Sequence, residues 1–152
     1  MTLNLRTDRK LIRARSSSTR YVLASIEAPE APAREHRLPV NIALVLDRSG
    51  SMSAENKFPL AVEAVRQALR LLDKNDRFSL VVFDNLVDVL TPSSLATAEA
   101  KRRAVRALED VGPRNNTDLC AGWMSGCEQI AEHLEGEAIS RALVLTDGLA
   151  NS

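Results

Sequence analysis

The chain has 152 residues, the size of one ordinary domain, and its 45% apolar content is enough for a hydrophobic core. Its 20 basic and 20 acidic residues balance, which gives no reason to expect nucleic acid or a membrane surface as a partner. No apolar run reaches the roughly 20 residues of a membrane span, and the N-terminal part lacks the apolar stretch of a signal peptide. We therefore expect a cytoplasmic protein.

Residues 1–38 are predicted to form a short β segment followed by a connector. Alternating apolar residues at 20–28 are typical of a strand, and three prolines with four charged residues at 29–39 indicate an extended connector. The N-terminus is rich in arginine and serine, as transit peptides are, but its apolar residues fit short strands better than an amphipathic helix.

Residues 39–152 are predicted to form a second unit, in which strands alternate with helices. Apolar runs predict strands buried on both faces at 40–46, 77–84 and 141–148. Apolar residues at helical spacing predict helices at 58–72, at 94–112 and from 117 or 118 to about 134. The stretch 87–92 is expected to be an edge strand, because it alternates with polar residues and contains a proline. This order predicts an α/β fold with a mostly parallel sheet flanked by helices.

Two groups of residues in these helices could bind a ligand, but their patterns are more typical of a structural role. The large side chains of the third helix are expected to pack in the core rather than hold a cofactor; they are Trp123, Met124 and Ile130. The second helix has a basic outer face, which is more typical of a solvated surface than of a phosphate-binding patch; its cations are Lys101, Arg102, Arg103 and Arg106.

The cysteines and histidines are not expected to form a disulfide or a zinc site. Cys120 and Cys127 are separated by two helical turns, about 10 Å, which is too far for a disulfide. His36 and His133 are far apart in the sequence, which gives little support for a zinc site or for a Cys/His nucleophile.

Aspartates end two of the predicted strands. Asp47 and Asp147 should lie beyond the carboxyl ends of parallel strands, where ligands bind in such sheets. Ser49 and Ser51 follow Asp47 at two and four residues, so a loop can turn both hydroxyls toward one point. Hydroxyl and carboxylate oxygens without nitrogen or sulfur suit Mg²⁺, Ca²⁺ or Mn²⁺. We therefore expect a site for a hard cation.

The same stretch, DRSGSM at 47–52, lacks the patterns of catalytic loops. Gly50 and Ser51 stand in the wrong order for a nucleophile elbow, and no Walker loop is present. A phosphate-transferring aspartate would have a second acid two residues later, where this chain has Ser49. No histidine is expected near enough to activate a serine. We expect no enzymatic activity.

Three segments together resemble a known family. VLDRSGSM at 45–52 resembles the Asp-x-Ser-x-Ser element of von Willebrand factor type A domains, which belongs to their metal-ion-dependent adhesion site. NNTDL at 115–119 is similar to the threonine loop of that site, and LVLTDG at 143–148 to the strand that ends in its second aspartate. Order and spacing match over residues 40–152, and the N-terminal β segment resembles that of bacterial members. The resemblance implies a Rossmann-like fold.

The resemblance also implies a function and a set of ligands. The implied metal ligands are Asp47, Ser49, Ser51, Thr117 and Asp147. The implied cation is Mg²⁺ first, with Ca²⁺ and Mn²⁺ as alternatives, and a Glu or Asp of a partner protein would complete its shell. The loop GPRNNTDL at 112–119 is bulkier than the glycine-rich loop common in bacterial members, so the resemblance does not define the surface that faces a partner. The candidate partner contacts are Arg48, Arg114 and Asn116. Asp118 is expected to cap the following helix.

Two other functions are compatible with this sequence. Some bacterial members of this family work as regulatory subunits of an AAA+ ATPase, and a metal-dependent hydrolase would use the same cation to activate water. A domain of family length would continue beyond Ser152, so we expect either a C-terminal truncation or a last strand covered by another chain.

Overall fold

The computed structural model describes residues 2–9, 17, 19–27, 37–114, 116–134 and 136–148, in two compact units, residues 1–37 and residues 38–152. The first unit contains an antiparallel pair of strands, β1 (Thr2–Thr7) and β2 (Val22–Glu27). Nearly all side chains of this pair are exposed. Most of the expected connector, with His36, lies outside the described residues.

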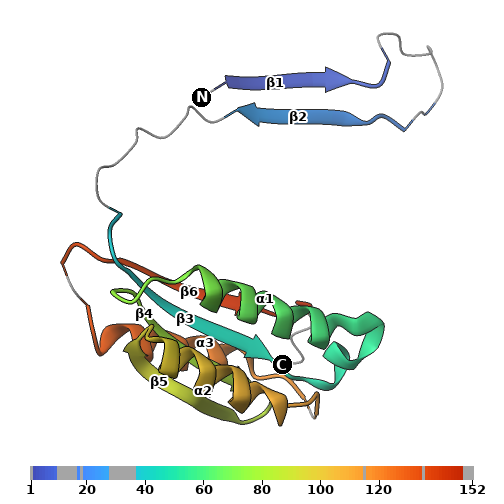
Figure 1. Ribbon diagram of the computed structural model, residues 1–152. Helices are drawn as coiled ribbons and strands as arrows, with labels where there is room; N and C mark the ends of the chain where they lie inside the picture. Colours follow the sequence, from blue (N-terminus) through green and yellow to red (C-terminus); the bar gives the residue numbers. More distant parts are fainter. Residues whose placement is uncertain are drawn as a thin grey trace. The chain divides into compact units, whose positions relative to one another are not determined.

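The second unit is built on a four-stranded sheet with the order β5-β4-β3-β6 (Figure 1). Its strands are β3 (Val40–Asp47), β4 (Arg77–Phe83), β5 (Val87–Leu95) and β6 (Ile139–Leu145). β3 pairs in parallel with both β4 and β6, while β5 pairs antiparallel with β4 at the edge. The expected mostly parallel sheet and the edge strand are therefore confirmed, although β5 continues past Pro92 to Leu95.

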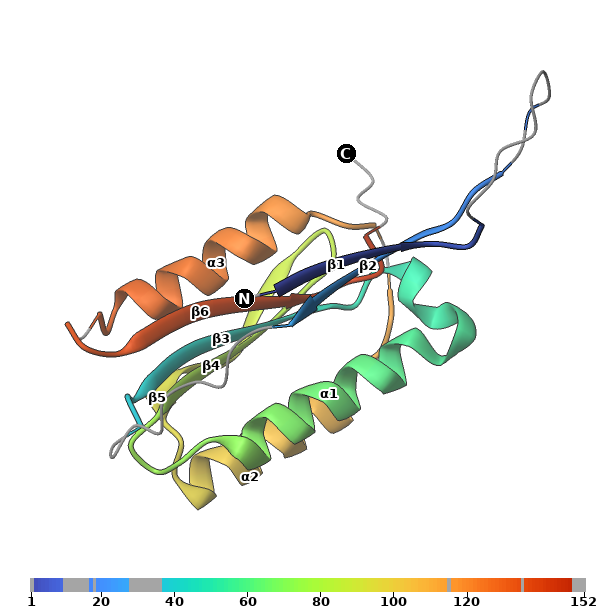
Figure 2. The ribbon, with the colours of Figure 1, turned by 90° about the horizontal axis from the view of Figure 1, so that it is seen from above.

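Helices cover both faces of this sheet. After a 3₁₀ segment, η1 (Gly50–Asn56), the helices are α1 (Lys57–Leu71), α2 (Ala98–Glu109) and α3 (Leu119–Ala131). Figure 2 shows α1 and α2 on one face and α3 on the other, which makes three layers. This is the Rossmann-like α/β fold that the alternation of strands and helices predicts.

The sheet has a hydrophobic cluster on each face. Leu44 and Leu46 of β3 pack with α1 and α2, whereas Ala43 and Val45 between them face α3. The neighbouring strand β4 divides its side chains in the same way. Both faces of β3 and β4 are covered, which explains why their sequences are apolar nearly throughout.

The prediction that Trp123 and Met124 pack in the core is wrong. Their exposed fractions are 48% and 47%, whereas Ile130 is buried as expected. The reason is that α3 approaches the sheet through Gly122 and Gly126. A Cβ atom on these glycines would lie 2.4 Å from Cγ of Phe83 and 2.5 Å from Cγ2 of Val45, respectively. The glycines occupy the inner face of the helix and leave its large side chains outside.

β6 differs from the two inner strands. It forms the second edge of the sheet among the described residues, and Ile139 and Leu143 are 39% and 47% exposed. The expectation that further chain or a partner covers this edge stays a prediction. Cys120 and Cys127 are free, as expected. In the described part of the chain, no helix is long and apolar enough to cross a membrane.

Candidate metal-binding site

The carboxyl ends of three neighbouring strands bring three aspartates to one end of the sheet. Asp47 is the last residue of β3, Asp84 directly follows β4, and Asp147 lies two residues after β6. β4 and β6 lie on opposite sides of β3, so the chain reverses its strand order at this point. Ligands bind at such a switch point in open α/β sheets because the loops diverge there.

Asp47 is fully buried and held by neutral donors. Its Oδ1 accepts a hydrogen bond from the backbone N–H of Ser49 (2.7 Å), and its Oδ2 accepts one from the hydroxyl of Thr146 (2.6 Å). No basic side chain of the described residues forms an ion pair with this carboxylate. A buried carboxylate is unfavourable without a positive partner, and a bound cation would provide one.

The two serines of the motif lie beside this carboxylate. The Oγ atoms of Ser49 and Ser51 are 3.1 Å apart, and the Ser51 hydroxyl donates to Oδ1 of Asp147 (3.3 Å). The structure therefore brings together hydroxyls and a carboxylate that are 96 residues apart in the sequence. Ser53 is outside this group, because it is exposed and donates to the carbonyl of Gly50 (2.7 Å) within the same turn.

Thr117 is held at the same end of the sheet by backbone hydrogen bonds on either side. The N–H of Arg114 donates to the carbonyl of Arg48 (2.7 Å), and the N–H of Asp118 donates to the carbonyl of Asp84 (2.7 Å). Thr117 is 7% exposed, and its Oγ1 is buried without a hydrogen-bond partner among the described residues. A buried hydroxyl without a partner is energetically unfavourable unless a bound ligand interacts with its oxygen.

Asp118 takes the helix-capping role expected from the sequence. Its side chain accepts a hydrogen bond from the N–H of Ala121 (2.9 Å) in the first turn of α3. This satisfies one of the free N–H groups at the start of the helix.

Lys57 contacts the candidate site, although the sequence did not indicate it. It is the first residue of α1, and its Nζ donates to Oδ2 of Asp147 (2.9 Å). The hydrogen bond to Asp147 raises the pKa of Lys57, and this effect is larger than the lowering of the pKa by burial. The negative charges of Asp147 and Glu55 raise the pKa further. A lone lysine after a turn carries no sequence signal for this contact, because the contact depends on how η1 folds over the end of β6.

Arg48 and Arg114, two of the candidate partner contacts, belong to an ion-pair network. Oδ2 of Asp84 accepts hydrogen bonds from Nε of Arg48 (3.1 Å) and Nε of Arg114 (2.6 Å), and both arginines also approach Asp88. Burial acts to raise the pKa of Asp84, but the hydrogen bonds from Arg114 and the Leu86 N–H, with the charge of Arg48, outweigh it and lower that pKa.

This network gives the three candidate partner contacts different exposures. The Arg48 side chain is only 7% exposed, and its guanidinium is bound inside the domain. The Arg114 side chain is 48% exposed, and Asn116 is also exposed. Arg114 and Asn116 are therefore the two positions that a partner can reach directly.

The donor set of the site consists of oxygen atoms. The described residues contain no group of three or more His, Cys, Asp or Glu side chains that could hold a metal ion, so hydroxyl oxygens would have to contribute to any metal site here. The five oxygen-bearing side chains are Asp47, Ser49, Ser51, Thr117 and Asp147, which include only two acids. Carboxylate and hydroxyl oxygens fit Mg²⁺, Ca²⁺ or Mn²⁺, and two negative charges would only just balance such an ion.

Comparisons with known proteins agree with this fold. The protein sll0103 of Synechocystis sp. is 30% identical over 148 residues, which are 95% of this chain and 33% of that protein. Human inter-alpha-trypsin inhibitor heavy chain H4 is 30% identical over 124 residues, which are 78% of this chain and 13% of that protein. The chain therefore spans about a third or less of these relatives.

Solved structures agree as well. The crystal structure of the vWF domain of the type V pili tip protein Mfa5 from Porphyromonas gingivalis has a TM-score of 0.63 and 18% identity, covering 74% of this chain and 39% of that chain. At this identity the likeness concerns the fold alone. The family model described as von Willebrand factor type A domain matches residues 42–149. The chain belongs to the von Willebrand factor type A domain family.

Proposed function

We propose that this chain is a protein-binding module that uses a divalent cation, with Mg²⁺ as the first candidate. The cation would be held by Asp47, Ser49, Ser51, Thr117 and Asp147, as in the metal-ion-dependent adhesion site that the motifs resemble. The cation would supply a positive centre at the surface, to which a Glu or Asp side chain of a partner protein can bind.

The observation that carries this proposal is the unpartnered hydroxyl of Thr117. It is buried at the same end of the sheet as the carboxylate of Asp47, which is also buried and pairs with no basic side chain of the described residues. If no ligand bound here, replacing that hydroxyl by a methyl group would make the fold more stable, since an unsatisfied buried hydroxyl costs about 1–3 kcal/mol. The hydroxyl of Thr117 is therefore explained better by the binding of a ligand than by a contribution to the stability of the fold.

The position of the only described histidine gives no support to catalysis by a serine that an imidazole activates. The carbonyl groups of His133 and Ile130 accept hydrogen bonds from Asn41, near the start of β3 and at the opposite end of the strand from Asp47. No imidazole in the described part of the chain thus lies beside Ser49 or Ser51 to act as a general base.

The test is capture of partner proteins by the immobilised chain in Mg²⁺ and in EDTA. We expect partners that elute with EDTA and that are lost with the Ser49→Ala and Asp47→Ala variants. Ser53→Ala is the matched control, because Ser53 lies in the same loop but bonds only within its turn. Circular dichroism checks that each variant is folded.

The outcome separates capture through a bound metal ion from capture that does not depend on metal. Capture that is the same in EDTA and Mg²⁺ and in Ser49→Ala would contradict a metal-bridged contact. Capture that responds to EDTA equally in Ser53→Ala and wild type, but not in Ser49→Ala, would support it. A cytoplasmic location and a link to an AAA+ ATPase stay predictions, and the identity of the captured proteins bears on both.

A further inference from the structure

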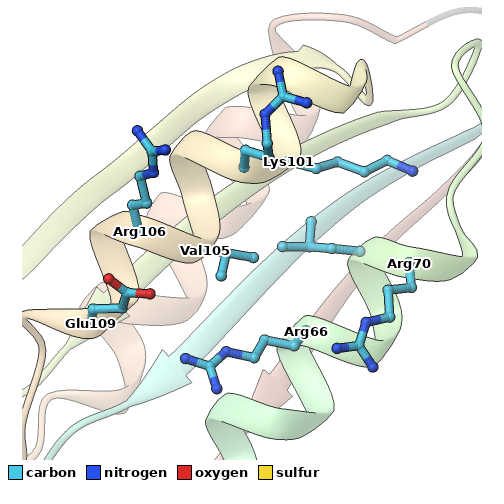
Figure 3. A pocket seen from close by; sticks show the side chains of 8 residues that line it. Arg66, Arg70, Lys101, Val105, Arg106 and Glu109 are labelled. Atoms are coloured by element: carbon cyan, nitrogen blue, oxygen red, sulfur yellow. The ribbon is translucent and has the colours of Figure 1, made fainter.

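A basic groove runs between α1 and α2 on the surface that faces away from the sheet. Its cations are Arg66 and Arg70 from α1 and Lys101, Arg102 and Arg106 from α2, and its volume is about 330 Å³. Figure 3 shows Arg66 and Arg70 of α1 across the groove from Lys101 and Arg106 of α2. The sequence analysis interpreted only the α2 half of this set, as a solvated helix face.

The positive charge of the basic groove is not balanced by its surroundings. Glu63 pairs loosely with Arg66 (4.0 Å) and Arg70 (3.8 Å), and Glu109 is the one acid that lines the groove. Five cations thus face two acids in a chain whose net charge is zero. Arg102 and Arg106 form no ion pair with a described residue. Concentrated charge of one sign attracts a ligand of the opposite sign.

Two further observations describe what would fit the basic groove. The Nε of Arg66 is buried without a hydrogen-bond partner among the described residues, so this donor of the groove is left unsatisfied. The floor is apolar, with Leu69 only 1% exposed and Val105 half-buried, and Figure 3 shows Val105 pointing between the helices. The groove therefore combines an apolar centre with guanidinium groups on both sides.

We propose that the basic groove binds an acidic amphipathic segment of a protein partner, with aliphatic side chains on the floor and Glu or Asp side chains on the arginines. Guanidinium groups bind carboxylates through paired hydrogen bonds, and a groove between helices accepts the apolar face of a helix. Single-stranded nucleic acid would use aromatic side chains for stacking, and no aromatic residue lines the groove. A lipid surface would need projecting apolar side chains, whereas Leu69 is recessed.

This surface is separate from the candidate metal site. None of the groove residues belongs to the five proposed metal ligands, and the groove lies on the α1 and α2 layer rather than at the carboxyl ends of the strands. The proposal therefore goes beyond the proposed function and predicts binding that persists in EDTA.

The experiment measures fluorescence anisotropy of a labelled peptide helix with leucines on one face and glutamates on the other, in EDTA. We expect saturable binding to the full chain that weakens with salt, and at least about tenfold weaker binding by an Arg102→Glu and Arg106→Glu double variant. The same peptide with glutamine in place of glutamate should bind at least about tenfold more weakly.

The matched control is Arg103→Glu, which makes the same charge change on the same helix as the single variant Arg102→Glu, measured beside the double variant. Arg103 pairs with Glu99 (2.7 Å) and does not line the groove, so this variant should bind the peptide within about twofold of wild type. Equal weakening by Arg103→Glu and by single Arg102→Glu would overturn the proposal, because it would show an effect of net charge alone. Tighter binding of oligo(dT) or of phosphatidylserine vesicles than of the peptide would overturn it as well.

Discussion

Lys57 gives the candidate site a positive charge of its own. Its ammonium group is bound to Asp147, one of the proposed metal ligands, so a divalent ion must approach against this charge. We expect Lys57→Met to bind Mn²⁺ about three- to tenfold more tightly than wild type at low salt, with a smaller gain at high salt because the lysine is partly exposed. Titration followed by electron paramagnetic resonance measures both affinities.

Lys57→Arg is the control for this prediction, since it keeps the positive charge. It should bind Mn²⁺ like wild type. If Lys57→Met binds the ion more weakly than wild type, the lysine supports the site rather than competing with the ion.

Asp84 is the residue on which the ion-pair network depends. Asp84→Asn removes the one fully buried carboxylate that pairs with the buried guanidinium of Arg48, so we expect a loss of about 3–5 kcal/mol in the free energy of unfolding at pH 7. The folded-state pKa of Asp84 is lowered, so its stabilising effect is complete above the unfolded-state value of about 3.9 and is lost as the pH falls through the folded-state pKa.

Urea unfolding of wild type and Asp84→Asn measures this effect at pH 7 and at a pH below 3.9. The difference between the two proteins should be largest at pH 7 and should shrink at the lower pH. Asp88→Asn is the control, because its carboxylate is 51% exposed and should contribute within about 1 kcal/mol. An equal cost for the two variants would show that burial of Asp84 is unimportant.

The sequence could predict some site residues and not others, for a physical reason. Asp47, Ser49 and Ser51 are close in the chain, so a local motif describes them. Thr146 and Lys57 contact Asp47 and Asp147 only through the tertiary fold. Arg48 stands among polar residues in the sequence, which suggests an exposed side chain. Its ion-pair partners, Asp84 and Asp88, are about 40 residues away, so the sequence does not indicate that Arg48 is buried.

At the scale of elements, α3 depends on its glycines. Alanine in place of glycine ordinarily stabilises a helix by about 0.5–1 kcal/mol. At Gly122, however, the added methyl group meets the fully buried ring of Phe83 at 2.4 Å, and overpacking of this kind costs about 1–3 kcal/mol. We therefore expect Gly122→Ala to lower the free energy of unfolding, as measured by urea denaturation.

Gly112→Ala is the matched control, because a Cβ atom there meets nothing within 4 Å. It should leave stability within about 0.5 kcal/mol of wild type. Stabilisation by Gly122→Ala would show that α3 can move away from the sheet without cost.

The same helix shows where sequence periodicity fails. β3 and β4 were predicted correctly because burial on both faces produces an unbroken apolar run. The expectation that the third apolar run is also buried on both faces is wrong, because β6 lies at an edge of the described sheet and Leu143 is 47% exposed. In α3 the inner face consists of Gly122 and Gly126, so the most apolar side chains are not the buried ones. Trp123 and Met124 were assigned to the core for their size, but the close approach of the helix leaves no room there for large residues.

At the scale of the whole molecule, the parallel sheet assembles the candidate site. Asp47 and Asp147 are 100 positions apart, and they share one end of the sheet because β3 and β6 are parallel neighbours. The loop with Thr117 reaches the same end because α2 runs back from the antiparallel edge strand β5. The order of the strands and helices is enough to predict the fold class and the meeting of these three residues at one end of the sheet. It does not predict which side chains form hydrogen bonds there.

The central claim is that Thr117 and the aspartate–serine motif hold a divalent cation. The most direct measurement is a Mn²⁺ titration of the 152-residue chain, followed by electron paramagnetic resonance, for wild type, Thr117→Val and Ser53→Ala. We predict one site that Mg²⁺ displaces, binding at least about tenfold weaker in Thr117→Val, and no change in Ser53→Ala. Thr117→Val should also unfold at no lower urea concentration without metal, because its hydroxyl has no partner to lose. Equal Mn²⁺ binding by wild type and Thr117→Val, or no binding by either, would contradict the account.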